Sequence, residues 1–240
     1  MYKNVLILDF MNTSFWIFTG LLIVNALLYI VGLAKKIKGL EKTCRVLFVP
    51  FIAGLIHSIL AGYLPDSYHI IFISSFAFVA ASLFMLFTLG DKNRFLKTVE
   101  EFFYAVSQVC WFLLIASVYR IYRIPQWLFI ITGIVYFAGF IVICIFIKKQ
   151  TFAKYASALL LYAFSTNLGI TAFLSIIYEK RLFAVILFLG SLVYMFGTVL
   201  IIFQKTRPFA ISEKVEKILI TITAVAASAL MGVGAILMQV

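Results

Sequence analysis

The stretch 190–205 reads GSLVYMFGTVLIIFQK and decides the fold class of the chain. It is apolar apart from small and hydroxyl-bearing residues, and it leads into the basic segment Lys205-Thr206-Arg207-Pro208. A helix of roughly 20 such residues, rising about 1.5 Å per residue, crosses a hydrocarbon layer about 30 Å thick. One hydroxyl, that of Thr198, lies about two helical turns before the charged end. This pattern predicts a pocket inside a bundle of membrane helices.

Comparable apolar blocks fill the rest of the chain. The chain is 65% hydrophobic and only 12% charged, whereas soluble domains carry about 25% charged residues. The sequence lacks the alternating segments of about ten residues that mark a membrane β-barrel. We therefore expect an all-α polytopic membrane protein, with one transmembrane domain over 1–240 and each helix beside the next in an up-down bundle. The eight expected spans are about 14–34, 44–64, 68–90, 99–119, 126–147, 153–177, 181–204 and 218–239.

The net charge of +11 follows the expected loops. The odd-numbered loops hold 15 of the 20 basic residues, and the other side holds Lys3, Arg120, Arg123, Lys180 and Arg181. Short cytoplasmic loops are enriched in Lys and Arg, so this bias places the odd loops in the cytoplasm and both termini outside, most simply in a bacterial cytoplasmic membrane. Anionic lipid head groups could also bind these residues. The charge needs no nucleic-acid partner to explain it.

Polar residues within the expected spans are neutral, because all nine acids lie outside the spans or at their edges. An intramembrane ion relay normally uses charged groups, so the sequence disfavours a proton-coupled transporter. Five neutral residues lie at one depth, roughly 9–14 Å below the cytoplasmic surface. If they face inward they line one cavity and bind its ligand; alternatively, they are ordinary hydrogen-bonding residues between helices. These residues are Asn25, Ser82, Gln108, Tyr162 and Thr198.

Other polar residues carry weaker expectations. The run Ser165-Thr166-Asn167 cannot share one helix face, because each residue turns the helix by about 100°. His57 stands alone in its span, and a hydrogen-bonded packing role is the simplest expectation. Glu100 and Glu101 are expected to start the fourth span, where carboxylates favour a helix N-terminus. The sequence has no metal-ligand spacing and no phosphate-loop or nucleophile motif, so we expect no metal and no cofactor.

The pattern resembles the YhhN-type lysoplasmalogenases over nearly the whole chain. The family's seventh helix reads approximately G-A-L-L-F-x-x-S-D-x-x-L-A, which 190–201 follow in length and pattern. Ser107-Gln108-Val109-Cys110-Trp111 stand where the family's fourth helix has S-H-x-x-Y, and 79–85 loosely match the S-x-x-G-D-x-x-L of its third. Arg45-Val46-Leu47, with Pro50, is similar to the K-P-L that opens helix two, and Tyr162 falls where helix six has a tyrosine.

The resemblance implies hydrolysis of the vinyl ether of lysoplasmalogens to a fatty aldehyde and a glycerophospho-head-group. The family's two aspartates correspond to Ser82 and Thr198 here, and its histidine to Gln108. Protonation of a vinyl ether needs a positioned acid, which neither hydroxyl supplies. Three functions therefore remain open: a hydrolase acting on a lysophospholipid from the cytoplasmic leaflet, with a catalytic group still unknown; an inactive lipid-binding relative; and a facilitative transporter or small channel. Membrane lipids are the expected partners.

Overall fold

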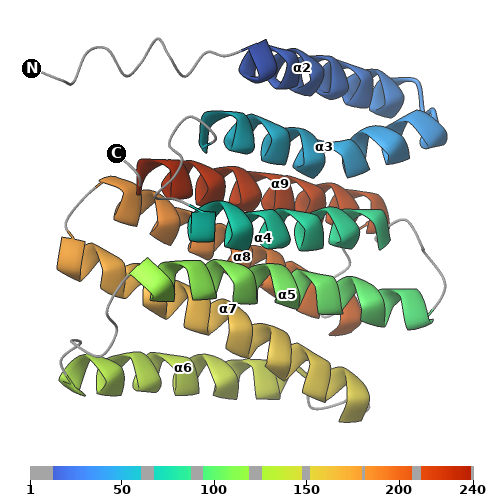
Figure 1. The fold of residues 1–240 in the computed structure, drawn as a ribbon. Coiled ribbons are helices and arrows are strands. Elements are labelled where there is room, and N and C mark those ends of the chain that lie inside the picture. Colours follow the sequence, from blue (N-terminus) through green and yellow to red (C-terminus); the bar gives the residue numbers. More distant parts are fainter. Residues whose placement is uncertain are drawn as a thin grey trace, which may run out of the picture.

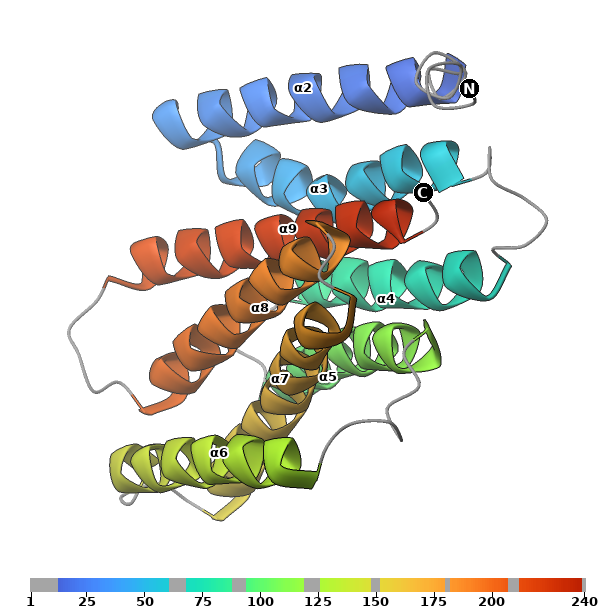
Figure 2. The same ribbon diagram turned by 90° about the vertical axis from the view of Figure 1, so that its left-hand side faces the viewer.

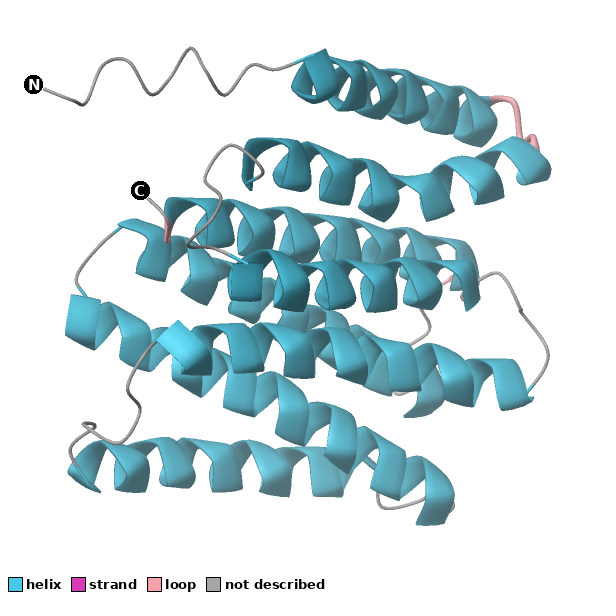
Figure 3. Cartoon of the chain, viewed as in Figure 1, coloured by secondary structure: helices cyan, strands magenta, loops and turns pink. Residues whose placement is uncertain are grey.

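A computed structural model describes residues 13–60, 68–87, 94–118, 126–147, 152–179, 182–206 and 212–238. Within these ranges the chain forms eight α-helices and no strand (Figures 1 and 3). The prediction of an all-α fold is confirmed. The helices are α2 (Thr13–Ala34), α3 (Lys38–Leu60), α4 (Tyr68–Phe87), α5 (Arg94–Val118), α6 (Gln126–Ile147), α7 (Phe152–Glu179), α8 (Leu182–Thr206) and α9 (Glu213–Leu237).

Seven of these helices are long and apolar enough to cross a membrane, which identifies the chain as a multi-pass membrane protein. The remaining helix, α6, is also largely apolar over its 22 residues, and its candidate stretch within the described residues is Ile130–Val142. Helices suit this environment because their backbone groups are hydrogen-bonded within the segment, where lipid offers no partners. The expectation of eight spans thus rests on whether α6 also crosses the membrane.

The helices form a flattened stack with α2 at one edge and α6 at the other, as both views show (Figures 1 and 2). Helix α3 packs between α2 and the pair α4 and α9, while α8 packs against both α7 and α9. The expectation that each helix packs beside the next fails at α5, because its principal partners are α4 and α7. Helix α6 instead packs on α7. Loop length limits which helices can be neighbours but does not choose among them.

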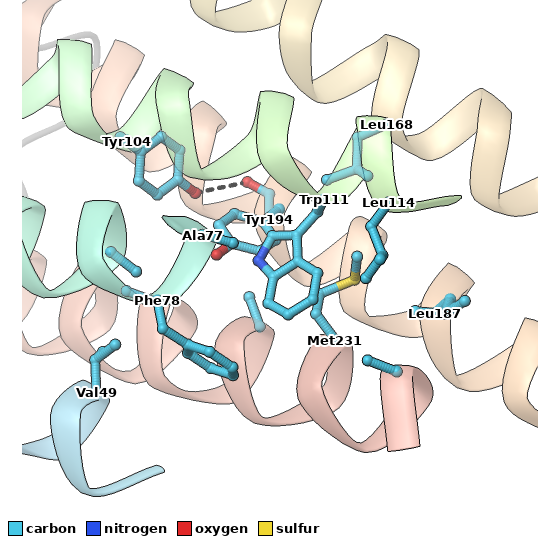
Figure 4. Packing of buried hydrophobic residues seen from close by; sticks show 14 of the residues in the cluster. Val49, Ala77, Phe78, Tyr104, Trp111, Leu114, Leu168, Leu187, Tyr194 and Met231 are labelled. Carbon is cyan, nitrogen blue, oxygen red and sulfur yellow. Dashed lines mark hydrogen bonds between the residues drawn. The ribbon is translucent and has the colours of Figure 1, made fainter. Parts of the chain in front are cut away.

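The main buried core is formed by α3, α4, α5, α7, α8 and α9. Its largest fully buried side chains include Trp111, Tyr194, Phe78 and Met231 (Figure 4). Helices α8 and α9 approach closely where they carry glycine: a Cβ on Gly190 would lie 2.8 Å from the Met231 sulfur. Small residues at such crossings let membrane helices gain dispersion contacts. The edge helix α2, by contrast, exposes most of its apolar surface.

Three helices begin earlier than their hydropathy predicts. Helix α3 starts at Lys38 instead of 44, α5 at Arg94 instead of 99, and α9 at Glu213 instead of 218. Hydropathy locates the part of a helix inside hydrocarbon, whereas the helix itself continues into the polar interface. The first turn of α5 contains no acidic residue, so the prediction that Glu100 and Glu101 start this helix is wrong. Parts of several predicted spans, such as 61–64 and 88–90, lie outside the described residues.

The turn between α2 and α3 is tight. The Ile37 N–H donates to the Gly32 carbonyl at 2.9 Å, and Lys36 adopts a left-handed backbone with φ of 57°. This is the hydrogen-bond pattern of a Schellman motif, in which glycine is the usual left-handed residue. The turn places Glu41 directly against Gly32, where the Glu41 amide nitrogen would lie 3.0 Å from an added Cβ. Helices α2 and α3 therefore form a compact hairpin.

Candidate functional site

A buried polar centre joins three helices in the middle of the bundle. It consists of Gln108 on α5, Ser165 on α7 and Thr198 on α8, none of which has any exposed surface. The Gln108 Nε2 donates to Thr198 Oγ1 at 3.2 Å, and the Ser165 hydroxyl donates to Gln108 Oε1 at 2.8 Å. The Ser165 and Thr198 hydroxyls also contact each other directly. The centre is therefore a closed triangle of one amide and two hydroxyls.

A second group of buried polar side chains continues from this centre. The Thr198 hydroxyl donates to the Tyr194 carbonyl at 3.1 Å, and the Tyr104 hydroxyl donates to the same carbonyl at 2.8 Å (Figure 4). The Tyr194 hydroxyl lies 2.9 Å from Ser107 Oγ, which in turn donates to the Ala77 carbonyl on α4 at 3.0 Å. A continuous set of polar contacts thus links α4, α5, α7 and α8.

The helical period explains why these side chains meet. In α5 the pairs 104/107 and 108/111 are three residues apart and the pairs 104/108 and 107/111 are four apart, so these residues share one face, as do residues 194 and 198 of α8. The close fit of Tyr104 requires a glycine opposite it, because a Cβ on Gly197 would collide with the Tyr104 hydroxyl. The sequence therefore places the polar groups and also leaves room for them.

Two further polar atoms beside this region are buried, the Trp111 indole nitrogen and the Ser228 hydroxyl. Both lie within reach of the Tyr194 hydroxyl, and Figure 4 shows the indole nitrogen beside the Tyr194 ring. Buried donors need an acceptor, which the Tyr194 hydroxyl offers them.

The chemistry available at the centre is hydrogen bonding. An amide and hydroxyls can orient a polar group, but they do not supply a proton at neutral pH as a general acid must. Among the described residues, no group of three or more His, Cys, Asp or Glu could hold a metal ion. The groups of the centre can therefore donate and accept hydrogen bonds, and they carry no charge.

Two of the five residues predicted from depth, Gln108 and Thr198, meet at this centre. The other three lie in different environments. Asn25 Nδ2 donates to the Cys44 carbonyl at 2.8 Å within the α2–α3 hairpin, and the Ser82 hydroxyl donates to the Phe78 carbonyl of its own helix at 2.7 Å. Tyr162 packs with Ala158 and Ile202, in a separate cluster. Its hydroxyl lies against Gly139 of α6.

The remaining polar residues of the spans are also placed. His57 Nε2 lies 3.0 Å from the Ser75 hydroxyl, which confirms its expected role as a hydrogen-bonded packing residue between α3 and α4. In the run 165–167, Ser165 and Thr166 are buried whereas Asn167 is exposed. This division agrees with the expectation that the three residues cannot share one face.

The sequence prediction missed Ser165 of the centre and the two tyrosines beside it, Tyr104 and Tyr194. The available signal was periodicity: Tyr104 is four residues before Gln108, and Tyr194 is four before Thr198. Residues four apart on a helix lie on the same face. A search for polar residues at this spacing would have found both tyrosines.

No protein-family model matches the chain, and no curated protein and no solved structure is significantly similar to it. The class is therefore defined by the structure itself, as a multi-pass α-helical membrane protein with a neutral polar centre.

Proposed function

We propose that this protein binds a single-chain amphiphile, such as a lysophospholipid, and does not hydrolyse it. In this proposal it is a divergent relative of the YhhN-type lysoplasmalogenases that uses the same region of the bundle. The supporting observation is the hydrogen bond between Gln108 on α5 and Thr198 on α8, two residues that are 90 positions apart in the chain. The resemblance equates these two positions with a histidine and an aspartate of the family, and the fold brings them together.

The absence of hydrolysis follows from the chemistry of the centre. Cleavage of a vinyl ether begins with protonation of a carbon atom and is completed by a directed water, so it needs an acid and a base in reach. Gln108, Ser165 and Thr198 supply neither, and the hydrogen bonds that they form with one another involve no carboxylate. Activity would require a group from elsewhere in the chain.

The closed geometry indicates how binding would proceed. The hydrogen bonds within the centre are satisfied by its own side chains, so a ligand must exchange with them. The Trp111 nitrogen and the Ser228 hydroxyl are additional buried donors next to Tyr194. A ligand oxygen that accepted from these groups would compensate for part of the hydrogen bonding lost when the helices move apart. We expect the acyl chain to lie along the apolar surface of the bundle.

The proposal is tested with purified protein and lysoplasmalogen. The expected result is no release of fatty aldehyde, together with retention of the lysolipid in native mass spectrometry. Thr198→Val, which removes the hydroxyl at nearly constant volume, should lower this retention. The matched control is Ser117→Ala, because the Ser117 hydroxyl donates only to the Leu114 carbonyl of its own helix at 2.7 Å.

Three outcomes would contradict the proposal. Sustained aldehyde release would show that the protein is an enzyme. Equal lysolipid retention by Thr198→Val and the wild type would show that the centre is not part of the binding site. Solute flux through protein-containing liposomes, with no lysolipid retained, would favour the facilitative transporter or channel.

The proposed orientation places the odd loops in the cytoplasm of a bacterial cell and both termini outside. It is supported by the excess of Lys and Arg in those loops. Single cysteines introduced at Lys36 and at Ser14 distinguish the two sides: an impermeant thiol reagent applied to intact cells should label only the second. The reverse labelling pattern would overturn the orientation.

A further inference from the structure

Asn167 is an amide that faces outward at the middle of a membrane span. The candidate span within α7 runs from Ala158 to Ile177, which places Asn167 near its midpoint. Its side chain is exposed, whereas the adjacent Ser165 and Thr166 are buried. The hydrogen bond recorded for this side chain joins Nδ2 to the Ala163 carbonyl at 2.9 Å, within the same helix.

This position is unfavourable for a single copy of the chain in lipid. An asparagine side chain offers two N–H donors and a carbonyl oxygen with two lone pairs, so one internal bond uses only part of its capacity. Hydrocarbon supplies no hydrogen-bonding partner at this depth, and exposed polar groups there are costly. The amide therefore favours contact with another polar group at the same depth.

The surrounding helix face is suited to packing against another helix. Seven residues before Asn167 stands Leu160, whose side chain is 59% exposed. Ala163 lies four residues before Asn167, and Ile170 lies three residues after it. Leu160, Ala163, Asn167 and Ile170 therefore share one stripe of α7. The stripe is turned about 200° from Ser165, which points to the polar centre, and so faces away from α5 and α8.

We propose that this stripe is the interface of a homodimer in which the Asn167 amides of two copies hydrogen-bond to each other. A second copy is favoured over another partner by symmetry. Copies inserted in the same direction are related by a two-fold axis along the membrane normal, so each residue on the axis meets itself at its own depth. An amide carries both donor and acceptor, so two Asn167 side chains can form a reciprocal pair.

The test measures dimerisation of the full chain in liposomes. Labelled protein is reconstituted over a series of protein-to-lipid ratios, and the dimer fraction is counted by single-molecule photobleaching. We expect the wild type to dimerise. Asn167→Leu should weaken the dimer about tenfold, because it removes two hydrogen bonds within the membrane. Asn167→Gln, which keeps the amide, should stay within about threefold of wild type. Unchanged helicity and thermal stability of each variant show that folding is intact.

Cross-linking tests the geometry independently. In a background with Cys44, Cys110 and Cys144 replaced by alanine, Asn167→Cys should form a disulfide-linked dimer under a membrane-permeable oxidant. The control is Ile134→Cys on α6, a position that is 64% exposed but lies outside the stripe. This variant should not form a disulfide-linked dimer. A wild-type protein that is monomeric at every density would overturn the proposal. Asn167→Leu dimers as tight as wild type, or no cross-link through Asn167→Cys, would also overturn it.

Discussion

The hydrogen bond between Gln108 and Thr198 should appear as a measurable coupling free energy. The two side chains are fully buried, and their atoms are 3.2 Å apart. Interhelical hydrogen bonds in membrane proteins contribute about 0.6 kcal/mol on average and up to about 1.7 kcal/mol. Gln108→Leu removes this bond and the one from Ser165, so we expect it to lower the free energy of unfolding by about 1–1.5 kcal/mol. Thr198→Val should cost about 0.6–1.2 kcal/mol through loss of the bonds that its hydroxyl forms with Gln108 and the Tyr194 carbonyl.

The assay is a double-mutant cycle measured by denaturant unfolding in bicelles. The double variant Gln108→Leu with Thr198→Val should be less destabilised than the sum of the single variants, by about 0.6 kcal/mol or more. The control cycle pairs Gln108→Leu with Ser82→Ala, since Ser82 bonds to its own helix. That pair should be additive within about 0.3–0.5 kcal/mol. Additive behaviour of Gln108 and Thr198 as well would refute the reasoning that the polar centre links α5 to α8.

Three further substitutions test how the helices are positioned. Gly197→Ala should displace the Tyr104 hydroxyl and break its hydrogen bond to the Tyr194 carbonyl. The unfolding free energy should fall by about 1–3 kcal/mol, and an unchanged value would contradict the packing at this crossing. Gly139→Ala should push Tyr162 away from α6 and lower the unfolding free energy by about 1–3 kcal/mol; an unchanged value would argue against this contact. Lys36→Gly should stabilise the α2–α3 turn by about 0.5–1 kcal/mol in the same unfolding assay, and a loss of stability would contradict the left-handed conformation.

The fold class follows from the sequence because hydrophobicity acts on whole segments. Each described helix overlaps an expected span, since about 20 apolar residues have few alternatives to a membrane helix. The predicted helix starts were less accurate, as the observed starts at Lys38 and Arg94 show. Hydropathy does not detect the part of a helix that continues into the polar interface. The packing of α6 on α7 instead of α5 depends on side-chain fit, such as Tyr162 against Gly139.

The site was only partly predictable for a related reason. Depth in the membrane can be counted along the chain, but the direction in which a residue faces depends on how the helices are rotated. Gln108 and Thr198 share both depth and direction, whereas Asn25 shares the expected depth but binds the Cys44 carbonyl inside the α2–α3 hairpin. Ser165 joins the centre although it is not one of the five residues selected by depth. The neighbours of each helix must be known before residues at a common depth can be assigned to one site.

The most direct test of the proposed function is an experimental structure of the protein with a bound alkyl-ether lysolipid, which lacks the vinyl ether. We predict the polar head group within hydrogen-bonding distance of Gln108 or Thr198, with the triangle of Gln108, Ser165 and Thr198 opened to admit it. A structure in which the triangle stays closed, and the lysolipid binds only to the outer surface of the bundle, would contradict the account.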